Sequence, residues 1–186
     1  MIFLGSLNNR NRVWRPSRPY VFLGVIVNVW IFFSLASYAQ SKTILVVGDS
    51  LTAGFGLVQS NSFPAQMERS LRQSGINVRI INAGVSGDTS AGGRSRLAWA
   101  LSENPDAVIL ELGANDGLRG LDPKQTEANL DAMIRKIRKH KIPVLLAGML
   151  APPNLGPKYT SEFNDLYVRL AIKHKILFYP FFLEGV

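Results

Sequence analysis

The chain has 186 residues, enough for one domain, and its 47% hydrophobic and 18% charged residues are ordinary for a globular protein. Its formal net charge of +8 does not indicate a nucleic-acid partner, because four arginines precede residue 40 and the remainder carries 17 basic against 13 acidic residues. The chain contains no cysteine, which excludes a disulfide framework, a thiolate metal site and a lipid attached through cysteine.

The first 39 residues are typical of a secretory leader. Arginines precede an apolar run from Tyr20 to Phe33, and Ser37-Tyr38-Ala39 fits a small-x-small cleavage site. The run is short for a membrane span, which needs about 20 apolar residues. We therefore expect a signal peptide over residues 1–39, cleaved after Ala39, and a periplasmic or secreted domain over residues 40–186 with no stable membrane span. An uncleaved signal anchor is the alternative.

From residue 40 onward, short β-branched runs alternate with segments of helical periodicity. We expect strands at residues 43–47, 78–81, 107–112, 144–149 and 177–179. We expect helices at 62–73, from a cap at 88 or 89 to about 101, from 122 to a basic end at 135–141, and around 163–170. Strands that are apolar along their whole length and alternate with helices are typical of a parallel sheet covered on both faces. The fold class expected is therefore α/β with three αβα layers.

Three polar motifs follow the first three predicted strands. Ser50 lies in Gly48-Asp49-Ser50-Leu51, Gly87 follows the second strand, and Asn115 follows the third. The carboxyl ends of strands in an open α/β sheet face one crevice, where such sheets bind their ligands. Singly, each motif is explained by an ordinary turn. Together they predict a ligand site at one edge of the sheet.

The residue types at these strand ends suit acyl transfer. A serine hydroxyl can attack an acyl carbon, and the oxyanion that forms needs fixed donors about 2.7–3.1 Å away. The Ser50 N–H can supply one donor, the Gly87 N–H a second, because glycine permits a close approach, and the Asn115 side-chain amide a third. We therefore predict a serine hydrolase.

These motifs resemble the SGNH, or GDSL-type, hydrolases. Gly48-Asp49-Ser50-Leu51 is similar to the first block of that family, Gly87 takes the place of the glycine in the second, and Gly113-Ala114-Asn115-Asp116 matches the third. The resemblance is strongest to the bacterial acyl-CoA thioesterase, lysophospholipase and arylesterase branch. It extends from about Lys42 to Val186, with a long match in register from Asn115 to Gly120 and another at Pro180-Phe181-Phe182.

The resemblance implies a flavodoxin-like sheet, a small acyl ester or thioester substrate, and no metal or cofactor. It also implies that Ser50 is the nucleophile and that Ser50, Gly87 and Asn115 form the oxyanion hole. An alternative substrate to the acyl ester or thioester is an acetylated carbohydrate, since a carbohydrate O-acetylesterase uses the same serine chemistry.

One departure from the family concerns the base. The family carries its catalytic Asp and His in an Asp-x-x-His block after the Pro-Phe-Phe segment, and these 186 residues do not contain it. We expect the two histidines, His140 and His174, to be exposed at helix ends on the far side of the sheet from Ser50. The expectation is thus a domain incomplete at its C-terminus, without the last helix and nearly inactive as given, or a non-catalytic exported binding module.

A basic stretch, Arg135 to Lys141, ends the helix that begins near residue 122. It could be a phosphate- or membrane-binding patch. No aromatic residue is interleaved with it, and cations suit the carboxyl end of a helix. We therefore interpret it as a solvated last turn.

Overall fold

The computed structural model describes residues 41–186. Residues 40–186 form one compact unit. The leader predicted over residues 1–39, with its cleavage site, lies outside the described residues. Among the described helices, none combines the length and the apolar character that crossing a membrane requires.

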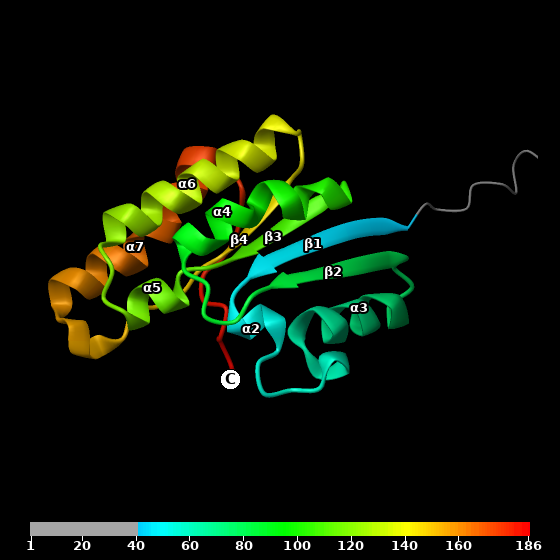
Figure 1. Cartoon of the computed structure of the whole chain (residues 1–186), viewed down its shortest axis with the longest axis horizontal. Coiled ribbons are helices and arrows are strands. Elements are labelled where there is room, and N and C mark those ends of the chain that lie inside the picture. The colour runs from blue at the N-terminus through cyan, green and yellow to red at the C-terminus, as the bar shows by residue number, and fades with distance from the viewer. Residues whose placement is uncertain (1–40) are drawn as a thin grey trace, which may run out of the picture. The chain divides into compact units, whose positions relative to one another are not determined.

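A five-stranded parallel sheet forms the centre of the domain, in the order β2-β1-β3-β4-β5 (Figure 1). Each strand pairs in parallel with its neighbour, so all five carboxyl ends lie at one edge. The strands are β1 (Lys42–Gly48), β2 (Val78–Gly84), β3 (Ala107–Glu111), β4 (Val144–Ala147) and β5 (Leu177–Tyr179).

Helices α4, α6 and α7 cover one face of this sheet, and α3 lies against the β2 side of the other (Figure 1). The expected α/β class with three layers is confirmed. The helices are α2 (Ser50–Ala53), α3 (Phe63–Gln73), α4 (Ser90–Ala100), α5 (Ala114–Leu118), α6 (Pro123–Lys139) and α7 (Pro157–His174).

Helix α6 shows how the sequence specifies these elements. It begins at Pro123, whose missing N–H costs nothing in the first turn, and the Asp122 carboxylate accepts a hydrogen bond from the Lys124 N–H at 2.9 Å. Its apolar stripe, predicted from the periodicity, is fully buried: Leu130, Met133, Ile134 and Ile137. At roughly 1.5–3 kcal/mol for each large apolar side chain, this burial exceeds what the cap contributes.

Two strand ends differ from the expectation by more than one residue, those of β2 and β4. β2 continues to Gly84 because Asn82 and Gly84 pair with Val46 and Gly48 of β1. β4 ends at Ala147, two residues early. The Gly148 N–H still donates to the Tyr179 carbonyl of β5 at 2.8 Å, but the Gly148 carbonyl accepts from the Phe182 N–H at 2.9 Å, beyond β5.

The sheet face that carries α3 also has an open apolar groove of about 710 Å³. Ile109 of β3 and Leu145 of β4 point into it, whereas their neighbours Val108 and Leu110 pack into the core under α6 and α7. This alternation follows the period of two along a strand. The groove reaches Leu51, next to Ser50, and Val186.

Candidate active site

Ser50 begins α2 directly after β1, at the carboxyl edge of the sheet. Asp49 caps this short helix, with its carboxylate accepting a hydrogen bond from the Leu51 N–H at 3.0 Å. A Cβ at position 48 would collide with the Thr52 hydroxyl and the Glu111 carboxyl. Glycine at position 48 therefore lets the chain turn sharply enough to present Ser50.

Gly87 lies in the loop between β2 and α4 and has φ +84°, a left-handed conformation that favours glycine. The Arg119 guanidinium donates to the Gly87 carbonyl at 2.9 Å. Within residues 41–186, neither the Gly87 N–H nor the Ser50 N–H donates to any group.

Asn115, in α5 after β3, connects the loop that carries Ser50 with the loop that carries Gly87. Its side-chain amide donates to the Asp88 carbonyl at 2.9 Å and, more weakly, to the Asp49 carboxylate at 3.3 Å. Asp88 follows Gly87 and Asp49 precedes Ser50. The structure thus brings the three predicted residues to one edge of the sheet, through contacts with their immediate neighbours.

Arg96 of α4 binds the loop after β2 and the ends of β1 and β2 at the carboxyl edge of the sheet. Its guanidinium donates to the carbonyls of Ala83 (2.7 Å) and Gly48 (2.9 Å), at the ends of β2 and β1, and pairs with the Asp88 carboxylate at 2.6 Å. A guanidinium offers five donors in a planar fork, which suits this three-way contact. Sequence reasoning missed this residue, because an arginine in a polar helix has no local signature of burial.

Asp116 was part of the predicted third motif, but without a role. Its carboxylate is buried and accepts hydrogen bonds from the Ser90 N–H (2.7 Å), the Ser90 hydroxyl (2.6 Å) and the Thr126 hydroxyl (3.1 Å). These contacts tie α5 to the beginning of α4 and to α6. The carboxylate therefore sets the position of Asn115, its neighbour in the chain.

Glu111, the last residue of β3, is 1% exposed. Its Oε2 accepts hydrogen bonds from the Thr52 hydroxyl at 2.8 Å and, at 3.4 Å, from the Asp49 N–H, while Oε1 has no hydrogen-bond partner in residues 41–186. Burial, with repulsion from Asp49 second, raises the pKa of Glu111 to about 8. Burial also raises the pKa of Asp49. A protonated Glu111 thus supports the turn that carries Ser50.

Replacing the Glu111 carboxyl should change how the free energy of unfolding depends on pH. The folded-state pKa of Glu111 lies above its ordinary 4.5, so its stabilising contribution is complete below pH 4.5 and is lost as the pH rises through about 8. One proton gives a slope of at most about 1.4 kcal/mol per pH unit. Between pH 5 and 8, urea unfolding of Glu111→Gln should lack this slope.

The matched control is Glu103→Gln, which removes an exposed carboxylate paired with Arg79. Its free energy of unfolding should fall with pH as in the unaltered protein. Parallel curves for the unaltered protein and Glu111→Gln would show that Glu111 does not retain a proton in the folded state.

The histidines lie where they were expected, but His174 is not exposed as predicted. Because α7 packs on α6, the His174 ring is 7% exposed and its Nε2 lies 2.7 Å from the Asp131 carboxylate. Burial alone would raise the pKa of Asp131, but hydrogen bonds from Lys173 and His174 lower it. His140 is exposed after α6. Both precede a strand, at the edge of the sheet opposite Ser50.

Comparison with known proteins agrees with this arrangement. Residues 46–185 match the GDSL-like lipase/acylhydrolase family. The chain is 46% identical over 153 residues to the esterase TesA of Pseudomonas aeruginosa, covering 82% of this chain and 76% of that protein. It is 35% identical over 179 residues to a thioesterase, protease and lysophospholipase of Escherichia coli, covering 96% and 81%.

The fold comparison gives the same result. The crystal structure of AlinE4, an SGNH-hydrolase family esterase, superposes with a TM-score of 0.78 at 50% identity and covers 81% of each chain. The chain therefore belongs to the GDSL-like lipase/acylhydrolase family, and the resemblance predicted from its motifs is confirmed.

Proposed function

We propose that the domain hydrolyses acyl esters or thioesters, with Ser50 as nucleophile. The observation that carries the proposal is the Asn115 amide, which contacts the residue before Ser50 and the residue after Gly87 at the carboxyl edge of the sheet. The relatives support the substrate class, since they are named as an esterase and as a thioesterase and lysophospholipase.

In the proposed reaction the Ser50 oxygen bonds to the acyl carbon while its proton passes to water or an added base. The bond to the alcohol or thiol then breaks, that leaving group takes up a proton, and water hydrolyses the acyl-Ser50. In both attacks the carbonyl oxygen becomes an oxyanion. The Ser50 and Gly87 N–H groups, which have no acceptor within residues 41–186, are available to bind it. Asn115 keeps one strong bond to the Asp88 carbonyl, while its 3.3 Å bond to Asp49 is weak enough to be exchanged for the oxyanion. Loss of one such donor typically costs about 10²–10³ in rate.

Deprotonation of the Ser50 hydroxyl is the slow step of the proposed reaction. The only two histidines of these 186 residues lie at the opposite edge of the sheet, and His174 is engaged with Asp131. A serine hydroxyl without a base is a weak nucleophile, and removing a triad base costs on the order of 10⁶ in turnover. We therefore propose that the 186-residue chain has the nucleophile and the oxyanion donors but very low activity.

Free imidazole should restore part of the missing step, because it can reach a half-buried Ser50 and accept its proton. With p-nitrophenyl octanoate as substrate, the rate of the 186-residue protein should rise with imidazole concentration and saturate with substrate. Fluorophosphonate labelling of Ser50 should rise in parallel.

The control is Ser50→Ala, which keeps the fold and the hydrolysis catalysed by imidazole alone. Equal rates for Ser50→Ala and the unaltered protein at every imidazole concentration would contradict the proposal. Binding of octanoate esters without any Ser50-dependent turnover would favour the non-catalytic binding module instead.

We also propose that the domain works outside the cytoplasm. The support is the leader-like composition of residues 1–39, with arginines before an apolar run and a small-x-small site at Ser37-Tyr38-Ala39. Expressed in a Gram-negative host, the protein should be recovered from the periplasm with Gln40 as its first residue. Recovery from the cytoplasm, or from the membrane with residues 1–39 attached, would contradict this.

A further inference from the structure

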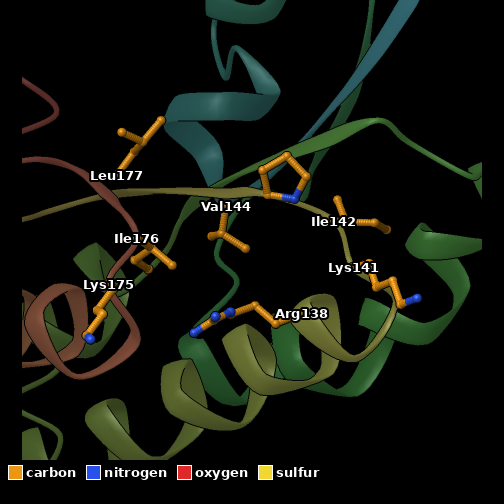
Figure 2. A pocket seen from close by; sticks show the side chains of 8 residues that line it. Arg138, Lys141, Ile142, Val144, Lys175, Ile176 and Leu177 are labelled. Carbon is orange, nitrogen blue, oxygen red and sulfur yellow. The ribbon is translucent and has the colours of Figure 1, made fainter.

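A second cavity, of about 480 Å³, opens at the amino edge of the sheet, opposite Ser50. It forms where α6 leads into β4 and α7 leads into β5 (Figure 2). In Figure 2 three cationic side chains border one hollow, with Val144 and Ile176 between Lys175 and Lys141. The lining residues are Arg138, Lys141, Ile142, Pro143, Val144, Lys175, Ile176 and Leu177.

The three cations of this cavity are not neutralised. Within residues 41–186, none of Arg138, Lys141 and Lys175 has a carboxylate within ion-pair distance. The acids at this edge have other partners: Asp106 pairs with Lys42 at 2.8 Å, and Asp131 pairs with Lys173 at 2.8 Å. The cavity therefore has an unbalanced positive charge.

The carboxyl ends of α6 and α7 do not cancel this charge. Each helix end carries only about half a negative charge, so two ends offset roughly one of the three cations. Exposed His140, beside Lys141, adds charge of the same sign when it is protonated. The basic stretch Arg135 to Lys141 was interpreted from the sequence as a solvated last turn. In the fold, Lys175 at the end of α7 borders the same cavity as Arg138 and Lys141.

Backbone geometry sets where the two lysines leave the chain, and one hydrogen bond positions the arginine. Lys141 and Lys175 have φ of 61° and 50°, the left-handed conformation that closes each helix and for which glycine or asparagine is usual. The Arg138 guanidinium donates to the His174 carbonyl at 2.6 Å, which joins the two helix ends. Figure 2 shows the two lysine side chains on opposite sides of the hollow with Arg138 between them, so the three cations border one cavity.

The remaining lining is apolar, which narrows the class of ligand. Ile142, Val144, Ile176 and Leu177 offer no hydrogen-bonding side chain, so a simple anion would leave most of the cavity unused. A volume of this size is typical of a small-molecule site. We propose that this cavity binds a small amphiphilic anion, a carboxylate or phosphate attached to an alkyl chain, with its head held by the cations that border the cavity and its first carbons on the apolar lining.

Calorimetric titration of the 186-residue protein with octyl phosphate, below its micelle concentration and at low salt, tests the proposal. One molecule should bind per chain, and inorganic phosphate should bind at least about tenfold more weakly, because it buries no alkyl carbon. The double variant Lys141→Asn/Lys175→Asn should weaken octyl phosphate binding about fivefold to tenfold. Asparagine tolerates the left-handed backbone, so this variant should keep its fold.

The matched control is Lys124→Asn/Lys158→Asn, which removes the same charge from the other ends of α6 and α7. This variant should bind octyl phosphate like the unaltered protein. Three results would each overturn the proposal: equal weakening in both double variants, inorganic phosphate binding as tightly as octyl phosphate, or binding only to phosphatidylglycerol vesicles, which would assign the patch to a membrane surface. None of these results depends on Ser50-dependent turnover, so the proposed function is tested separately.

Discussion

The amide of Asn115 is the contact on which the candidate site depends. The residues around Ser50, Gly87 and Asn115 come from loops that follow three different strands, and a parallel sheet places the ends of those strands together without fixing the loops themselves. The Asn115 amide supplies the missing constraint by bonding to Asp49 and to Asp88. Arg96 completes it by holding the ends of β1 and β2 together with the Asp88 carboxylate. The proposed oxyanion hole requires donors that are positioned before the reaction, and these contacts limit the movement of the loops that would carry them.

Buried carboxyl groups support this network and make it sensitive to protonation. Asp49, Glu111 and Asp116 are all buried near the carboxyl edge, yet their environments differ. The Asp116 carboxyl receives three hydrogen bonds from Ser90 and Thr126. Glu111 lies against Asp49 with one oxygen unpaired, and two adjacent buried carboxyls do not readily both ionise. The turn that presents Ser50 is therefore built on a neutral Glu111, and Gly48 is required there because a larger residue would displace it.

Local pattern was sufficient to predict the five strands and the longer helices, but not the short helices α2 and α5 that carry Ser50 and Asn115. The strands were mostly apolar runs, and α6 had a cap, a proline and a clear stripe. What could not be predicted depended on contacts between distant segments. Arg96 reaches 48 residues back to Gly48, and Glu111 reaches 59 back to Thr52, so neither has a local signature. His174 was expected to be exposed because it ends a basic helix, but packing of α7 on α6 places it against Asp131, 43 residues away. The cluster of Arg138, Lys141 and Lys175 is likewise a product of the fold.

The central claim is that one tetrahedral centre bonded to Ser50 is bound by donors from three separate loops. A crystal structure of the domain with Ser50 phosphonylated, formed with imidazole present, measures this directly. We expect a phosphonyl oxygen about 2.7–3.1 Å from the Ser50 nitrogen, the Gly87 nitrogen and the Asn115 Nδ2, with the amide of Asn115 turned away from Asp49. A phosphonyl oxygen that faces solvent, or that is bound by none of these donors while Asn115 stays on Asp49, would contradict it.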